Sequence, residues 1–396
     1  MGKPSGKEQD YTAMGMRRAI VLLSIPTILE MGMEALFALV DTYFVSKLGG
    51  GHRDRWFDRI ADGTGVFHGL GLGMGITAVV ARRTGAKDRP GTRIAAGQSL
   101  FLAIVLGLVL AIPAALFAPR LLVMMGAGAD VLAVATPYAR LMLASNLVVT
   151  LLFAINAVFR GAGDPGIALR TLAIANGINI VLDPALIFGL GPFPALGLYG
   201  AAVATTIGRS IGVLFLLWNL IRPGGNFGIT RAHVRPVAKV LRGIIKVSLG
   251  GVGQFLIASL SWVFLVRIIA MFGTVAVGGY MVAVRIVIVA MLPAWGMANA
   301  AATLVGQNLG AEQLDRAARS AWWCGHYNMV YMVLVTVLVL VGSAASFRSS
   351  TMDPRPMGMP FSRCGRISLG YFFYGYGMVL AQALNGAGDS LDTDLA

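Results

Sequence analysis

Apolar stretches long enough to cross a membrane follow one another along almost the whole chain, and they constrain the fold most. A helical span needs about 20 mostly apolar residues, and within lipid its backbone must hydrogen-bond to itself. Alternating segments of about ten residues, typical of membrane barrels, are not seen. We therefore expect an all-α polytopic membrane protein. The spans lie near 19–46, 66–81, 94–118, 130–158, 167–190 and 195–221, and then near 243–272, 276–305, 318–342 and 367–385.

The composition excludes an ordinary soluble protein. Of the 396 residues, 57% are hydrophobic and 13% are charged, whereas soluble domains are about 45–50% apolar and about 25% charged. A net charge of +14 could indicate nucleic-acid binding, but Lys and Arg in the loops of a membrane protein explain it more simply. Cys324 and Cys364 have no spacing typical of a disulfide framework or a zinc site. The polar N-terminus lacks the features of a cleaved signal peptide.

The positive charges alternate along the loops and predict an orientation. The segments 82–93 and 222–242 each carry five Lys or Arg, and Arg160 and Arg170 flank another loop of the same set. The loops 191–194 and 273–275 carry none. Because basic loops stay in the cytoplasm, we expect a multi-pass protein of the cell (inner) membrane with a cytoplasmic N-terminus.

An internal repeat divides the chain into two similar halves. The tetrapeptide Gly-Ala-Gly-Asp at 161–164 recurs at 386–389, an offset of 225, and 85–88 matches 310–313 at the same offset. A six-span unit keeps both copies in the same orientation, so this is a parallel repeat of two six-helix bundles. We expect these domains: a cytoplasmic N-terminus at 1–18, an N-terminal bundle at 19–221, a basic cytoplasmic linker at 222–242 and an incomplete C-terminal bundle at 243–396.

Two segments do not fit the repeat. Residues 51–65 are charged where their counterparts at 276–290 are apolar, and 343–366 differ in the same way from 118–141. The second half ends at Ala396, the counterpart of Thr171. About ten of twelve helices are thus expected, and the sequence predicts local reading-frame errors and a truncated C-terminus.

Acidic residues inside the spans are the strongest chemical signal. The first span carries Glu30, Glu34 and Asp41, and the fifth carries Asn179 and Asp183. A carboxylate at membrane depth costs about 2.5–3.5 kcal/mol on insertion scales, so such groups usually face a cavity and serve transport. Glu34 and Asp41 share one helix face, as do Asn179 and Asp183. These oxygens could carry a proton or bind Na⁺, and the residues alone leave the choice open.

The sequence favours a transporter over an intramembrane enzyme. Residues 161–164 and 184–186 match the GxGD and PAL strings of intramembrane aspartyl proteases, but the first is duplicated in a loop at 386–389. The sequence shows no Ser–His–Asp set, phosphate-binding loop or cluster of metal ligands. We therefore expect no enzyme activity, no metal site other than a site for Na⁺, and no cofactor.

Several strings together resemble one family. They are Asp-Thr-Tyr-Phe-Val at 41–45, Arg-Gly-Ala-Gly-Asp at 160–164, Asn-Ile-Val-Leu-Asp-Pro at 179–184 and Gly-Leu-Tyr-Gly-Ala-Ala at 197–202. This resembles the multidrug and toxic compound extrusion (MATE) family, in which two six-helix bundles form a V-shaped cavity. The resemblance is to the prokaryotic branch with its ion-coupling centre in the N-terminal bundle. It implies a coupling and substrate site at Asp41, Asn179, Asp183 and Thr205, with Tyr138 and Asn156 lining the cavity.

The resemblance also implies a function. Members of this family export organic cations and other amphipathic drugs, driven by inward H⁺ or Na⁺, so we expect a monomeric antiporter embedded in the lipid bilayer, with no nucleic-acid partner. Two alternatives remain. One is a flippase for lipid-linked precursors, which would need a basic cluster in its cavity. The other is a truncated membrane fragment that does not transport.

Overall fold

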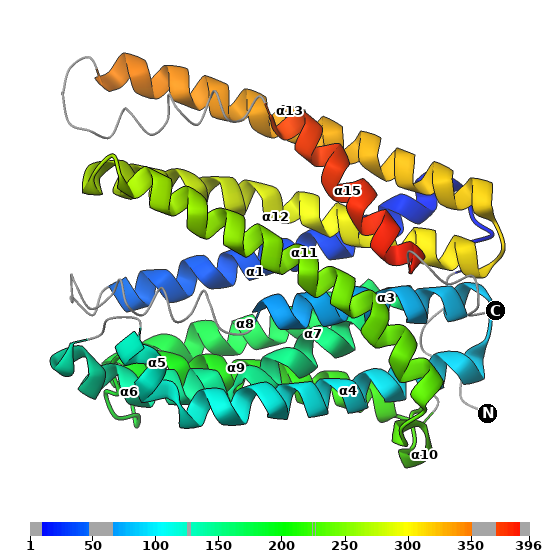
Figure 1. The fold of residues 1–396 in the computed structure, drawn as a ribbon, viewed down its shortest axis with the longest axis horizontal. Helices are drawn as coiled ribbons and strands as arrows, with labels where there is room; N and C mark the ends of the chain where they lie inside the picture. The colour runs from blue at the N-terminus through cyan, green and yellow to red at the C-terminus, as the bar shows by residue number, and fades with distance from the viewer. Residues whose placement is uncertain are drawn as a thin grey trace.

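Long helices that lie side by side make up the computed structural model (Figure 1). It describes residues 10–46, 66–124, 128–223, 225, 227–350 and 370–388, and the regular elements in these residues are α-helices. Their bounds are α1 Met16–Ser46, α3 Val66–Gly85, α4 Arg89–Leu116, α5 Ala118–Met124, α6 Ala129–Ala144, α7 Asn146–Gly161, α8 Pro165–Phe188, α9 Leu198–Ile221, α10 Arg231–Val234, α11 Ala238–Ala270, α12 Thr274–Gly310, α13 Leu314–Ser350 and α15 Tyr371–Ala387. The predicted all-α fold is confirmed.

Each predicted span coincides with a helix to within about five residues, except the fourth and the span at 318–342, whose helix continues eight residues further, to Ser350. Six helical stretches in the described part are long and apolar enough to cross a membrane: Met16–Phe37, Arg89–Leu116, Ala135–Gly161, Pro165–Phe188, Leu198–Ile221 and Ala238–Ala270. The fourth span consists of two helices, α6 and α7, that meet at Ser145. The first atypical segment, 51–65, lies outside the described residues. Of the second, 343–366, residues 343–350 continue α13 and residues 351–366 lie outside the described residues.

Local signals fix several helix ends. The Asp88 side chain accepts a hydrogen bond from the backbone N–H of Gly91 at 2.9 Å and caps the start of α4. Helix α8 begins at Pro165, where the missing N–H costs nothing. It ends before Gly189, whose φ of 74° is readily adopted only by glycine.

The backbone repeats itself at the offset found in the sequence. Among the described residues other than glycine, only Lys87 and Glu312 have a positive φ, 58° and 60°, and they are 225 positions apart. Gly163 and Gly388, with φ of 84° and 74°, are separated by the same number. Left-handed conformations are costly for side chains with a Cβ, so this match reflects equivalent turns in the two halves.

The contacts between the halves are reciprocal. Gly71 of α3 lies against Val252 of α11, and their counterparts Gly296 of α12 and Thr27 of α1 lie against each other in the same way. When two residues from different halves are in contact and their counterparts in the repeat are also in contact, the two halves have a two-fold arrangement. Because the matched helices run in the same direction, the two halves form the parallel repeat that the sequence predicts.

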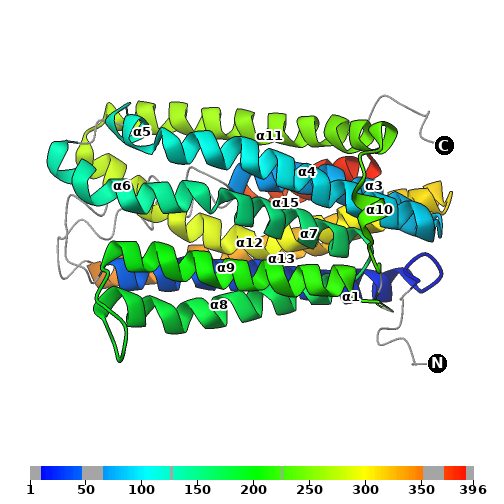
Figure 2. The same ribbon diagram turned by 90° about the horizontal axis from the view of Figure 1, so that it is seen from below.

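Helix α1 lies at the junction of the two halves. It packs against α8 of its own half and against α12 of the other half, as Figure 1 shows, with α12 above it and α8 below. In the view from below (Figure 2), α8 and α9 cover α1, and α4, α6 and α7 lie beside them. The core of the N-terminal half is formed by α3, α4, α7 and α9, with fully buried residues such as Leu72, Ile155, Phe159 and Leu216.

Candidate functional site

A buried polar cluster joins α8 and α9 in the N-terminal half. Asn179, Asp183 and Thr205 are 1%, 0% and 6% exposed. The Asn179 Nδ2 group donates hydrogen bonds to Asp183 Oδ1 at 3.1 Å and to Thr205 Oγ1 at 3.4 Å. The structure therefore brings together three of the residues that the sequence singled out.

Close approach of two helices places this cluster. Asn179 and Asp183 are one helical turn apart on α8, so their side chains lie one above the other. On α9, a Cβ at Gly208 would lie 2.8 Å from the carbonyl oxygen of Ala175, and one at Gly200 only 2.4 Å from that of Leu186. Both glycines let α9 approach α8 closely, as small residues do in membrane helices.

The backbone of Asp41 lies level with this cluster. The side chain of Asn176 donates to the carbonyl of Met33 at 2.9 Å, and the rings of Phe44 and Phe188 are 6.5 Å apart. These two contacts show that α1 and α8 run side by side in the same direction. Asp41, eight residues after Met33, therefore occupies the same height along α8 as Asp183, which is seven residues after Asn176.

The other predicted site residues are more scattered. Tyr138 of α6 is 6% exposed and packs in an apolar cluster with Ala202, three residues before Thr205. Asn156 of α7 is 2% exposed, and its Oδ1 has no hydrogen-bond partner in the described part of the chain. Glu34 is half-buried on α1. Hydrogen bonds between described residues do not connect Asn156 or Glu34 to the α8–α9 cluster.

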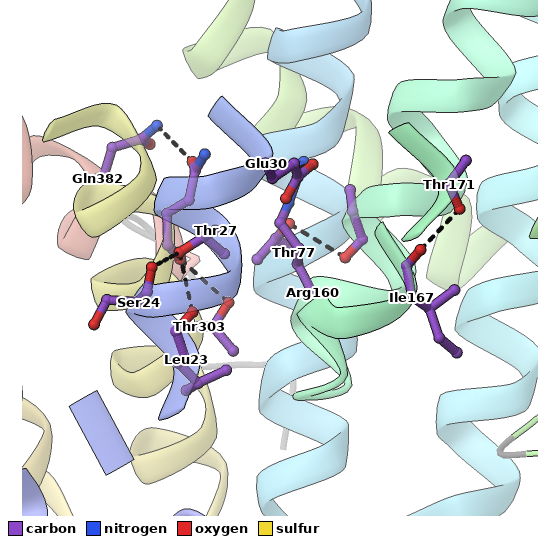
Figure 3. A network of polar contacts seen from close by, with 12 residues as sticks. Leu23, Ser24, Thr27, Glu30, Thr77, Arg160, Ile167, Thr171, Thr303 and Gln382 are labelled. Carbon is purple, nitrogen blue, oxygen red and sulfur yellow. Dashed lines mark hydrogen bonds and ion pairs between the residues drawn. The ribbon is translucent and has the colours of Figure 1, made fainter. Parts of the chain in front are cut away.

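A buried ion pair is the feature that the sequence reasoning missed. Arg160, expected to flank a cytoplasmic loop, is only 6% exposed at the end of α7. Its Nη1 donates to Oε1 of Glu30 on α1 at 2.7 Å, and Figure 3 shows the two side chains against each other. The apolar residues that precede Arg160 could have indicated that it belongs to the span. Its partner is 130 positions away, and the pairing comes only from the tertiary arrangement that brings these two side chains together.

A small cavity lies between the two halves beside this ion pair. Its volume is ≈ 20 Å³, enough for about one water molecule. Arg160 and Thr77 line it from the N-terminal half, and Asn299, Gln382 and Asn385 line it from the C-terminal half. The Asn385 amide donates to Oε1 of Gln382 at 3.0 Å. This junction thus combines one ion pair with a group of neutral amides.

The chemistry of the α8–α9 cluster suits a proton or a small hard cation. It offers a buried carboxylate, a hydroxyl oxygen and Oδ1 of Asn179, which has no hydrogen-bond partner within the described segments. Oxygen ligands of this kind are the ones that hard cations prefer. The described residues contain no group of three or more His, Cys, Asp or Glu side chains that could hold a metal ion.

Comparisons with known proteins agree with this architecture. The chain is 25% identical over 387 residues to the probable multidrug resistance protein NorM of Thermotoga maritima, covering 95% of this chain and 81% of that protein. It is 24% identical over 293 residues to the multidrug export protein MepA of Staphylococcus aureus strain MRSA252, covering 74% of this chain. This alignment spans 64% of the length of MepA.

A solved structure shares the fold. The crystal structure of MATE in complex with MaL6 superposes with a TM-score of 0.87 at 25% identity, covering 97% of this chain and 86% of that one. The model of the MatE family matches residues 26–185 and 251–393, one segment in each half of the repeat. The chain therefore belongs to the MatE family.

Proposed function

We propose that the protein is a secondary-active exporter of organic cations and other amphipathic drugs, driven by inward movement of H⁺ or Na⁺. The observation that carries this proposal is the buried cluster of Asn179, Asp183 and Thr205, level with Asp41 on the helix that touches both halves. The names of NorM and MepA, a multidrug resistance and a multidrug export protein, support the substrate class.

The proposed mechanism couples the ion to the position of α1. A proton or Na⁺ at Asp41 and Asp183 neutralises charge next to α1 and changes how α1 packs against α8 and α12. An ion can shift an equilibrium between outward- and inward-facing states only as far as its affinities for the two states differ. Drug release then accompanies ion entry because both bind to the same alternating structure.

Separate ion gradients test this function. The protein is reconstituted in vesicles, and the transport of ethidium, a fluorescent organic cation, is measured under an H⁺ gradient alone and under a Na⁺ gradient alone. We expect Asp183→Asn to reduce driven transport by roughly tenfold or more, in the range of ordinary coupling energies. The isosteric amide keeps the shape of the site but cannot release a proton or carry the charge that Na⁺ needs.

Asp315→Asn is the matched control, because Asp315 is an exposed carboxylate at the start of α13. It should transport like the unaltered protein. Driven transport that persists undiminished in Asp183→Asn would refute the coupling role. Absence of ethidium transport under both gradients would favour the alternative of a fragment that does not transport.

The remaining assignments belong to the same proposal. Glu34, Tyr138 and Asn156 are proposed to line the path of the drug, and the protein to be a monomer of the inner membrane with a cytoplasmic N-terminus. The domain boundaries proposed from the sequence place the basic linker 222–242 between the halves. A lipid-precursor flippase is less well supported, because Arg160, the cation that lines the described cavity, is already paired with Glu30.

A further inference from the structure

We propose that Glu30 is a second proton-binding site, distinct from the α8–α9 cluster, which takes up a proton when its ion pair with Arg160 separates. The inference rests on the export function proposed above, since it assigns the pair a step in the same cycle. It concerns the junction of the halves, where α1, α7 and α12 meet.

The Glu30 carboxylate is buried and only half satisfied. Its side chain is 2% exposed, and Oε1 accepts from Arg160 Nη1 at 2.7 Å. The other oxygen, Oε2, is buried and has no hydrogen-bond partner among the residues that the structure describes. A carboxylate has about four acceptor positions, and an unsatisfied one away from water is costly. Pairing with Arg160 therefore offsets the free-energy cost of burying the charge of Glu30.

The surroundings offer no replacement for Arg160 among the described residues. Glu34, one turn along α1, adds a like charge. The facing stretches 69–81 of α3 and 291–308 of α12 contain no ionisable side chain. On α8, Arg170 is exposed and Asp183 is itself acidic. On α9, Arg209 lies over the ring of Phe37, two turns from Glu30 along α1.

Any rearrangement that moves α1 away from α7 separates Glu30 from Arg160 and carries the free-energy cost of breaking this ion pair. Separation of the pair would leave a bare carboxylate in an apolar setting, which is strongly unfavourable. A proton from water that adds to a Glu30 oxygen removes this cost. The new O–H bond breaks when the pair forms again, and the proton returns to water. No electrons are transferred.

The position of the pair supports a role in transport. Arg160 lines the cavity between the halves, which has room for about one water beside the pair. The counterparts of Glu30 and Arg160 in the second half are Phe255 and Asn385. The Asn385 amide bonds to the neutral side chains of Gln254 and Gln382. The ionisable pair is therefore specific to the half that contains α1.

The test measures how many protons accompany each ethidium ion. Full-length protein in vesicles is given a pH difference of one unit with no membrane potential, and the limiting ethidium gradient is recorded. Each coupled proton then multiplies that gradient about tenfold, since about 1.4 kcal/mol corresponds to a factor of ten. We expect Glu30→Gln to transport with a limiting gradient about tenfold smaller than the unaltered protein. Asp315→Asn, which removes an exposed carboxylate at the start of α13, should leave it unchanged.

A second variant tests whether a loss of transport in Glu30→Gln is due to misfolding. The double variant Glu30→Gln, Arg160→Gln removes both charges and leaves two amides that can bond to each other, and it should show the same tenfold loss as the single variant. An unaltered gradient in either variant, or an exporter that shows no H⁺-driven component, would overturn the proposal.

An infrared measurement decides the proposal even without transport. Lowering the pH should produce the carbonyl stretching band of a protonated carboxylic acid that disappears in Glu30→Gln and persists in Asp315→Asn. Absence of such a Glu30 band would refute the site. If the unaltered protein moves no ethidium, the proposed function fails, and this band still reports whether Glu30 binds a proton.

Discussion

At the scale of single residues, burial decides which polar groups carry information. Asp183 was recognised because acidic side chains are costly in a membrane, whereas Thr205 was assigned through the family resemblance. The structure buries both. The same argument applies to Glu30, yet its significance becomes visible only with Arg160 beside it. Burial identifies candidates, whereas the partner of each group identifies its role.

Tyr11 illustrates a residue whose role lies outside the spans. It is 4% exposed, and its hydroxyl donates to the carbonyl of Gly163 at 3.0 Å, which ties the N-terminal segment to the turn between α7 and α8. Desolvation by burial, together with the nearby Asp164 carboxylate, raises the pKa of Tyr11 to about 12. In an unfolded chain the pKa of tyrosine is about 10.

This shift predicts an alkaline loss of stability. Because the folded-state pKa is the higher one, the contribution of Tyr11 is complete below about pH 10 and is lost as the pH rises toward the folded value. Tyr11→Phe should cost about 1–2 kcal/mol at neutral pH through the unpaired carbonyl, and it should lack this alkaline component. Thermal unfolding in detergent at a series of pH values measures both effects.

The control for this prediction is Tyr199→Phe, since Tyr199 is 40% exposed at the start of α9. It should behave like the unaltered protein at every pH. Equal alkaline losses in Tyr11→Phe and the unaltered protein would show that another group is responsible.

At the scale of helices, small residues set how closely the halves approach. At the C-terminal ends of α3 and α12, Gly85 lies against the carbonyl of Gln307 and Gly310 against that of Arg82, another reciprocal pair at the offset of 225. Neither glycine was singled out in the sequence as a contact between halves. Small residues at helical spacing indicate close packing, but they do not say which helix lies opposite.

A methyl group at this contact should be destabilising. A Cβ at Gly310 would lie 1.8 Å from the backbone oxygen of Arg82, so Gly310→Ala must push α3 and α12 apart. We expect a loss of about 1–3 kcal/mol, as for other overpacked sites, measured as a lower thermal unfolding temperature in detergent.

Gly250→Ala in α11 provides the comparison, because nothing lies within 4 Å of a Cβ at that position. It should be neutral or stabilising by about 0.5–1 kcal/mol through helix propensity. Equal stability of the two variants would contradict the proposed close contact.

At the scale of the whole molecule, the parallel repeat predicts which loops face the same side of the membrane. The turns at Lys87 and Glu312 are equivalent, so they should face the same side of the membrane. Phe193, in the loop between α8 and α9, should face the opposite side. The positive-inside rule places the first two in the cytoplasm.

Labelling with a membrane-impermeant maleimide checks this arrangement. In a background with Cys324 and Cys364 replaced by serine, Phe193→Cys should react in intact cells. Lys87→Cys and Glu312→Cys should react only after the membrane is opened. Labelling of Lys87→Cys and Glu312→Cys from opposite sides would contradict the parallel repeat, and labelling of both from outside would reverse the orientation.

The sequence by itself determined the class of fold, the approximate positions of the membrane spans and the parallel repeat. These follow from the length of the apolar runs and from a repeat offset that can be counted along the chain. Asn179 and Asp183 were also predictable, because polar groups within apolar helices are rare and costly, whereas Thr205 followed from the family resemblance. The break of the fourth span at Ser145 was not predicted, since a single-residue interruption of the helix does not change the length of the predicted span.

Only the tertiary structure decided which side chains meet across helices. The pairing of Glu30 with Arg160, the reciprocal glycine contacts and the place of α1 between the two halves depend on how each helix is rotated and on which neighbour it packs against. In a membrane nearly every helix face is apolar, so the hydrophobic pattern along the sequence cannot specify that rotation. Close packing and the few polar contacts specify it instead, and these form between residues far apart in the chain.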